Sequence, residues 1–200
     1  MKTTKAEREI HRFWKRFPDC IELDGELSTV EKIKKRLRAE GVLLTEDGDK
    51  IMKSREFRKS LDYAEPGRVL RICTASSSQL TEGEWTNYGK VFFVEDVINA
   101  IKSIGGRPCP LWVGPYLRLR YTHQLPLETV LVASEPALFA YTNDPYMFEL
   151  CAREDRIDVS RPAPHEYAFD VRSRDRLILG GFFSAPRAKV SCCARWVFAI

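Results

Sequence analysis

The sequence lacks the short motifs by which many cofactor-dependent and hydrolytic enzymes are identified. None of its 200 residues falls in a phosphate-binding P-loop, a G-x-G-x-x-G turn, a G-x-S-x-G elbow or an H-E-x-x-H helix. Its three histidines, His11, His123 and His165, are widely separated, so no serine or cysteine nucleophile has an obvious base beside it. The motifs therefore identify no enzyme class.

Long apolar runs are also missing. No run approaches the roughly 20 residues that a membrane-spanning helix needs. The first seventeen residues, MKTTKAEREIHRFWKRF, are charged and have a helical pattern, without the apolar centre of a signal peptide. With 44% hydrophobic and 30% charged residues the composition is that of an ordinary folded protein. We therefore expect a cytoplasmic protein with no membrane partner.

None of the six cysteines belongs to a C-x-x-C pair. Cys192 and Cys193 are adjacent, and on a strand they would point to opposite faces and would not hold one ion together. We expect free thiols and no metal site.

Lysine becomes scarce after residue 60. The net charge of +4 is carried by residues 1–60, whereas residues 61–200 are balanced and have 13 arginines but only 3 lysines. Arginine makes planar, bidentate contacts with phosphate and carboxylate. The bias indicates anion recognition or, alternatively, the codon usage of a GC-rich genome.

Residues 1–65 have the pattern of a helical, basic segment. Ser28 and Glu31 form a capping-box pattern at the start of a helix over residues 29–40. A strand at 42–44, a tight turn at 46–49 and a strand at 51–52 would complete a winged helix-turn-helix, with 29–40 as the recognition helix. The nucleic-acid-binding candidates on this helix are Lys32, Lys35 and Arg36. Alternatively, this is one of the many folds with a basic helix beside a hairpin, since the acidic turn would repel phosphate where a wing should approach it.

Residues 66–200 have the pattern of a larger β-rich domain, and Pro66-Gly67 marks its start. Its central unit consists of a strand at 69–74, a polar loop at 75–88, a strand at 90–94 and a helix that ends at Gly105. The remaining expected elements are strands at 116–122, 129–133, 155–160, 166–171, 176–183 and 189–198, and a helix beginning at Asp144. The pair Gly180-Gly181 indicates a bulge or a close backbone approach.

The expected strand at 116–122 is a second nucleic-acid-binding candidate. Its alternation places Tyr116, Arg118 and Arg120 on one face. Arginines beside tyrosines suit backbone phosphates and stacked bases. The alternative is an exposed sheet face whose arginines pair with acidic neighbours. We predict an α+β fold, in which the helical basic N-terminal segment packs on a larger, mainly antiparallel sheet with one or two helices.

Arg71 on a strand, a polar loop, and then W-T-N-Y-G-K-V-F-F and a helix form one pattern over residues 67–106. This arrangement resembles the first half of ADP-ribosyltransferase-like folds. The resemblance implies NAD as cofactor, with Arg71 contacting it and Tyr88 stacking on nicotinamide. Glu166, in HEYAFDV, would be the late acidic residue.

Three functions remain open at this point. The first is a non-enzymatic accessory or regulatory protein, without a cofactor, that binds nucleic acid or a nucleoprotein complex. The second is an NAD-using enzyme with an ADP-ribosyltransferase-like core. The third is a protein-binding inhibitor or adaptor, because sheet edges and aromatic patches also serve that purpose.

Overall fold

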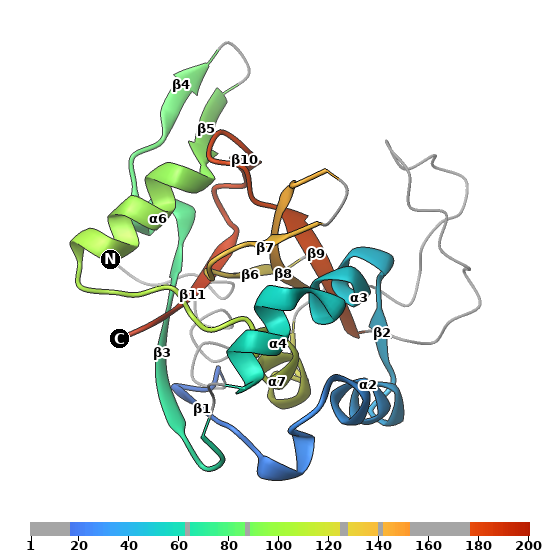
Figure 1. Ribbon diagram of the computed structural model, residues 1–200. Helices are drawn as coiled ribbons and strands as arrows, with labels where there is room; N and C mark the ends of the chain where they lie inside the picture. Colours follow the sequence, from blue (N-terminus) through green and yellow to red (C-terminus); the bar gives the residue numbers. More distant parts are fainter. Residues whose placement is uncertain (1–16, 63–64, 87–88, 125–127, 140–141, 153–176) are drawn as a thin grey trace.

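A computed structural model (Figure 1) describes residues 17–62, 65–86, 89–124, 128–139, 142–152 and 177–200. These residues form helices on a large, mostly antiparallel sheet, so the predicted α+β class is confirmed. Tyr88, Glu166, residues 1–16 of the N-terminal helical pattern, and the strands predicted over 155–160 and 166–171 lie outside the described residues. Within these ranges, no helix has the length and apolarity to cross a membrane.

The large sheet has the strand order β1-β3-β11-β6-β8-β9-β2, and β7 pairs with β8. Its strands are β1 (Cys20–Glu22), β2 (Val42–Leu44), β3 (Val69–Ser76), β6 (Thr129–Val132), β7 (Ala137–Leu138), β8 (Pro145–Ala152), β9 (Leu177–Phe183) and β11 (Arg195–Ala199). Neighbours are antiparallel except for two parallel pairs, β11 with β6 and β2 with β9. The domain boundary predicted near residue 65 stays a prediction, and β1 and β2, which precede it, pair with strands that follow it.

Two hydrophobic cores lie on opposite faces of this sheet. One face packs against α2 (Val30–Ala39), α3 (Glu46–Lys53), α4 (Arg55–Asp62) and α7 (Val113–Arg120). The other packs against α6 (Val94–Ser103) and a small sheet of β10 (Lys189–Val190), β5 (Gly89–Phe93) and β4 (Glu84–Thr86). The short helices η1 (Gly25–Leu27) and α5 (Ser77–Leu80) complete the described elements.

The C-terminal strand β11 is buried on both faces. Trp196 and Phe198 belong to the core under α6, whereas Val197 and Ala199 belong to the core under α7. This division follows from strand geometry, in which successive side chains point to opposite faces. The strand predicted over 189–198 is present only in part, because residues 191–194 separate β10 from β11.

Glycines allow two helices to approach the sheet closely. A Cβ atom at Gly114 of α7 would lie 2.4 Å from the ring of Phe148, and one at Gly48 of α3 would lie 2.7 Å from the Leu179 carbonyl oxygen. In β9, a Cβ atom at Gly181 would lie 2.8 Å from Asp47. The β8–β9 pairing continues unbroken across this position. Of the two predicted explanations for Gly180-Gly181, the close approach is confirmed.

The turn and strand predicted over residues 46–52 are wrong, because these residues form α3. The Thr45 hydroxyl accepts a hydrogen bond from the Gly48 amide at 3.1 Å and so caps the helix. Glu46, Asp47 and Asp49 lie in its first turn, where the helix dipole favours negative charge. Residues 42–44 therefore pair with β9 and not with 51–52, and the predicted wing hairpin does not form.

In two further places the predicted type of secondary structure is wrong, one a helix predicted as a strand and the other a strand predicted as a helix. The strand predicted over 116–122 is wrong, because Val113–Arg120 forms α7, with Pro115 in the first turn where no amide donor is needed. The helix predicted to begin at Asp144 is also wrong, because β8 begins at Pro145. Proline is tolerated as the first residue of a strand. Apolar residues on both sides of β8 fit a strand buried in the middle of the sheet.

Candidate nucleic-acid interface

The helix predicted over 29–40 is confirmed as α2, although its cap is one residue later than expected. Thr29, and not Ser28, accepts the hydrogen bond from the Lys32 amide, at 3.3 Å. Ile33 and Leu37 are fully buried against the sheet. Gly41 follows the helix with a φ of 68°, a left-handed conformation that glycine adopts without steric cost. Ordinary capping and packing therefore hold the outer face of α2 in place.

Four cations lie exposed on this outer face, namely Lys32, Lys35, Arg36 and Arg38. Arg36 pairs with Glu40 at 2.7 Å. Among the described residues, Lys32, Lys35 and Arg38 have no carboxylate within ion-pair distance. Side chains of this kind are available to an anionic ligand without first giving up an internal partner.

Lys34 differs from its neighbours because it points inward. It is 7% exposed and forms an ion pair with Asp49 of α3. The same carboxylate binds Lys53 at 2.5 Å. Burial favours a higher pKa for Asp49, but hydrogen bonds from Lys34 and Lys53 outweigh it and lower the pKa of this carboxyl below its usual value. Asp49 therefore ties α2 to α3 as a carboxylate.

A cleft of about 550 Å³ lies where these two helices meet β2. It is lined by Lys34 and Arg38 of α2, by Glu46, Asp49 and Lys53 of α3, and by residues 41–45 between them. β2 is the last strand in the order of the large sheet. Three cations and two carboxylates give the lining a positive balance, and Arg38 is its cation without an ion-pair partner among the described residues.

The second predicted group of binding residues does not share one surface. On α7, Arg120 is exposed, but Tyr116 is buried and its hydroxyl donates hydrogen bonds to the carbonyl oxygens of Asp24 at 3.1 Å and Leu27 at 2.9 Å. Burial raises the pKa of Tyr116 to about 12. The ring predicted to stack on bases therefore anchors the chain around η1.

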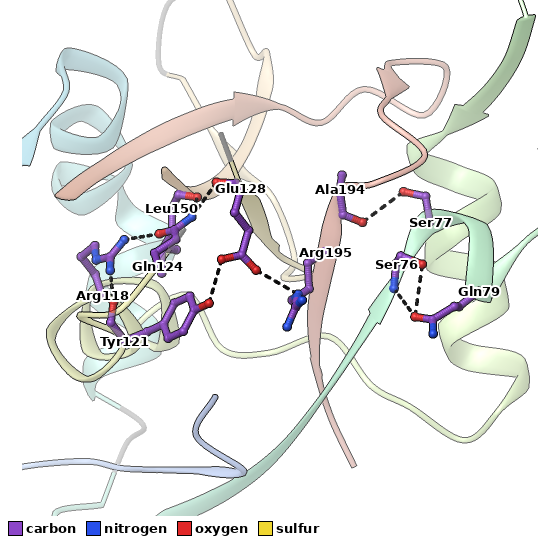
Figure 2. Close-up of polar contacts among 10 residues, drawn as sticks. All are labelled: Ser76, Ser77, Gln79, Arg118, Tyr121, Gln124, Glu128, Leu150, Ala194 and Arg195. Atoms are coloured by element: carbon purple, nitrogen blue, oxygen red, sulfur yellow. Dashed lines mark hydrogen bonds and ion pairs between the residues drawn. The ribbon is translucent and has the colours of Figure 1, made fainter. Parts of the chain in front are cut away.

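Arg118 is 0% exposed and lies inside the protein (Figure 2). Its guanidinium donates hydrogen bonds to the Gln124 side-chain oxygen and to the carbonyl oxygens of Tyr121 and, at 3.4 Å, Cys151. Burial lowers the pKa of Arg118 to about 10, so the group is still charged at neutral pH. Its contacts join the end of α7 to β8.

The network continues from Arg118 to β11 (Figure 2). The Gln124 amide donates to the carbonyl oxygens of Glu128 and Leu150, both at 2.7 Å. The Tyr121 hydroxyl donates to the Glu128 carboxylate at 2.7 Å, and the other oxygen of that carboxylate lies 3.2 Å from Nε of Arg195. These groups are largely buried and hold the loop after α7 against the sheet, which is a structural role.

The residues suggested by the NAD interpretation are only partly described. Arg71 is exposed on β3, and its carbonyl oxygen accepts a hydrogen bond from the Ile200 amide at 3.3 Å. Tyr88 and Glu166 lie outside the described residues. In the described part of the chain, no three His, Cys, Asp or Glu side chains gather as metal ligands. The NAD interpretation therefore stays a prediction.

The polar loop predicted over 75–88 is partly folded, and several of its polar groups are used internally (Figure 2). Gln79 accepts hydrogen bonds from the Ser76 amide at 2.8 Å and from the Ser76 hydroxyl at 3.1 Å. The Ser77 hydroxyl is buried and accepts one from the Trp196 indole at 3.0 Å. These contacts fix α5 against β11.

Sequence reasoning missed Lys34, Asp49, Gln124 and Glu128. Lys34 had a usable signal, because it falls beside Ile33 and Leu37 on the apolar stripe of the helix, where a charged residue needs a buried partner. Asp49, Gln124 and Glu128 gave no such signal, because their partners come from other elements.

No protein-family model matches this sequence, and neither a curated protein nor a solved structure matches it.

Proposed function

We propose that this chain is a non-enzymatic accessory protein that binds nucleic acid through α2 and the adjoining cleft. One observation carries the proposal. α2 exposes Lys32, Lys35, Arg36 and Arg38 on a helix whose other side is fixed in the core, and three of these four cations have no carboxylate partner among the described residues. When lysines and arginines of this kind contact the phosphates of a nucleic acid, they release the counterions bound there, and this release favours binding.

The surroundings of α2 support the same ligand. Arg38 faces a cleft that also contains Lys34 and Lys53, so phosphate oxygens entering it would meet cations from two helices. Arginine suits phosphate because its planar fork donates two parallel hydrogen bonds. The acidic residues of the cleft are engaged with lysines, Glu46 with Lys50 at 2.8 Å and Asp49 with Lys34 and Lys53. Their repulsion of phosphate is thereby reduced.

The test is fluorescence anisotropy with labelled single- and double-stranded DNA and RNA at about 50 and about 200 mM salt. We expect wild-type binding that weakens steeply as salt rises. The double variant Lys35→Glu/Arg36→Glu should bind at least about tenfold more weakly, because two favourable phosphate contacts become repulsive. Its unfolding by urea should be nearly unchanged, because both side chains are exposed.

The matched control is Lys102→Glu/Lys189→Glu, which makes the same change in net charge. Both lysines are exposed, and they lie on α6 and β10 at the opposite face of the sheet. We expect this variant to retain most of the affinity. Equal losses in the two variants would mean that net charge alone drives association, and the assignment to α2 would fail.

A protein-binding role is the second candidate, and Trp85 favours it. This side chain is 80% exposed on β4, the last strand of the small sheet in the order β10-β5-β4. Among the described residues no strand pairs with the other edge of β4, and an exposed tryptophan on such an edge is typical of interaction surfaces. If this role holds, Trp85→Ala should abolish capture of a cellular protein by the immobilised chain, while Lys35→Glu/Arg36→Glu should leave capture intact. The reverse pattern would favour the nucleic-acid role.

A further inference from the structure

Cys192 and Cys193 occupy the centre of a tight turn between β10 and β11. The Ala194 amide donates a hydrogen bond to the Ser191 carbonyl oxygen at 3.1 Å and closes this turn. Both thiols are exposed, and their sulfur atoms are 3.4 Å apart. The expectation that the two side chains point to opposite faces of a strand is wrong, because the residues lie in a turn and not on a strand.

We propose that Cys192 and Cys193 form a reversible redox site that closes to a disulfide within the turn. A disulfide needs its sulfur atoms about 2.05 Å apart, and the two sulfur atoms here are already in contact. The remaining approach takes place at the surface, where core packing does not oppose rotation of the two exposed side chains. The inference is independent of nucleic-acid binding.

The oxidant is a small-molecule disulfide of the glutathione class. The thiolate of one cysteine attacks a sulfur atom of the oxidant and forms a mixed disulfide, and one glutathione leaves. The second cysteine then attacks the protein sulfur atom, the Cys192–Cys193 bond forms, and the second glutathione leaves. Two electrons pass to the oxidant, and the two thiol protons end on the two released glutathiones.

The neighbouring thiol disfavours the thiolate of Cys193. The hydrogen bond with Cys192, and then its charge, raise the pKa of Cys193. Because neighbouring Cα atoms across a trans peptide are about 3.8 Å apart, less than the usual disulfide spacing, the closed ring is strained and more easily reduced than a structural disulfide. This strain makes the site reversible.

The other four cysteines are protected from the same reaction. Cys109 is buried, and burial raises its pKa to about 12. Cys151 is partly buried, and burial again raises its pKa. Cys20 and Cys73 are also only partly exposed. Only Cys192 and Cys193 combine exposure with contact between their sulfur atoms, so mild oxidation should select the turn.

Oxidation of the turn would also affect α5, because two amides of α5 donate hydrogen bonds to the turn. The Ser78 amide donates to the Cys192 carbonyl oxygen at 3.4 Å, and the Ser77 amide donates to the Ala194 carbonyl oxygen at 3.0 Å. Ring closure reorients the peptide between the two cysteines, and with it the Cys192 carbonyl group. We expect the long bond from Ser78 to break and α5 to loosen.

The experiment titrates the full chain with oxidised glutathione and measures intact mass, free thiols and hydrogen exchange. We expect a mass lower by two hydrogens, loss of two of the six thiols, a Cys192–Cys193 link in the peptide map, and full reversal by dithiothreitol. Amides in residues 77–81 should exchange up to about tenfold faster after oxidation, as expected for one lost hydrogen bond.

Two variants keep the test specific. Cys193→Ser should not lose two hydrogens and should instead retain one glutathione at Cys192. Cys20→Ser, which removes a thiol elsewhere, should react as the wild type does. Loss of two hydrogens by Cys193→Ser would overturn the proposal, as would disulfide-linked dimers or a stable glutathione adduct on the wild type. Unchanged exchange in residues 77–81 would overturn the link to α5.

Discussion

α2 and α7 lie on the same side of the large sheet, and each has two arginines in its last turn. On α2 both arginines, Arg36 and Arg38, are exposed. On α7 Arg120 is exposed, but Arg118 is fully buried and donates its hydrogen bonds to groups of the protein itself. Similar sequence content thus gives a surface available to ligands in one helix and an internal support in the other.

The difference comes from what surrounds each arginine in the sequence. α2 has polar residues at most positions and an apolar stripe on one side, so four of its five cations point to solvent and only Lys34 lies on the buried side. In α7, every residue from Val113 to Arg118 is buried, so this part of the helix has no exposed side on which to place Arg118, and only Arg120 at its end reaches solvent. Arginine supports a binding hypothesis only where one side of its element is clearly polar.

Replacing the interior arginine should have the largest effect. Arg118→Met keeps a long side chain but leaves the Gln124 side chain and the carbonyl oxygens of Tyr121 and Cys151 without their donor. Leaving buried acceptors unpaired should lower the free energy of unfolding by about 3 kcal/mol or more. Urea unfolding is the measurement, and Arg120→Met is the matched control, with an expected change within about 0.5 kcal/mol. Similar losses in the free energy of unfolding for the two variants would contradict the claim that Arg118 is an internal support and Arg120 is not.

Adding a methyl group where α7 contacts β8 should have the next largest effect on stability. In Gly114→Ala, the added methyl group would lie 2.4 Å from the Phe148 ring. Alanine ordinarily favours a helix over glycine by about 1 kcal/mol, but overpacking typically costs about 1–3 kcal/mol. Because the Phe148 side chain is itself fully buried, we expect net destabilisation in thermal or urea unfolding. An increase in stability would mean that α7 can move away from β8.

The two arginines of α2 can be compared directly by charge reversal. Arg38 lines the cleft without a carboxylate partner among the described residues, whereas Arg36 is paired with Glu40. Arg38→Glu should therefore weaken nucleic-acid binding about tenfold, and Arg36→Glu by less, because the Arg36 contact already competes with an internal ion pair. Anisotropy titrations at one fixed salt concentration would rank them. The opposite ranking would place the ligand on the outer flank of α2, away from the cleft.

Asp49→Asn should change binding and stability in opposite directions. Removing this carboxylate makes the cleft more positive and releases Lys53, so binding should tighten by a few-fold. Lys34, which is 7% exposed, loses its counter-charge, so the protein should be less stable at neutral pH. Anisotropy and urea unfolding on the same sample test both signs. Weaker binding by a folded variant would mean that Asp49 itself contacts the ligand.

The pH dependence gives the smallest of these effects. Because Asp49 has a lowered pKa in the folded protein, its ion pairs stabilise the fold above its unfolded pKa of about 3.9. That contribution is lost as the pH falls through the folded pKa. Acid should therefore destabilise Asp49→Asn less steeply than the wild type when urea midpoints are compared below about pH 5. Parallel curves would show that the Lys34–Asp49 pair adds nothing to stability.

Local patterns predicted the elements that follow one clear period. The helical stripe over residues 29–40 predicted α2, and the apolar run over 177–183 predicted β9. The pattern over 90–104 predicted a strand followed by a helix, which are β5 and α6. Residues 116–122 alternate as a strand does, yet they lie largely in α7, which is buried on all sides from Val113 to Arg118 and so shows no helical stripe. Contact with β8 and β9 accompanies the helix, and a short sequence window contains no information about this contact.

The candidate site was predictable only in part for a similar reason. The exposed cations of α2 follow from the helical period alone. The cleft depends on α3, and the acidic run that begins α3 is equally typical of a turn until Thr45 is known to cap a helix. Likewise, the adjacency of Cys192 and Cys193 in sequence did not reveal the turn that brings their sulfur atoms together.

The most direct test of the central claim is the salt dependence of nucleic-acid binding by the wild type and by Lys35→Glu/Arg36→Glu. Each phosphate contact contributes a slope of about −0.9 on duplex DNA and about −0.7 on single strands in a plot of log affinity against log salt. We expect a steep wild-type slope that falls by the equivalent of about two contacts in the variant. No binding by the wild type at low salt, or the same slope for both proteins, would contradict a nucleic-acid interface on α2.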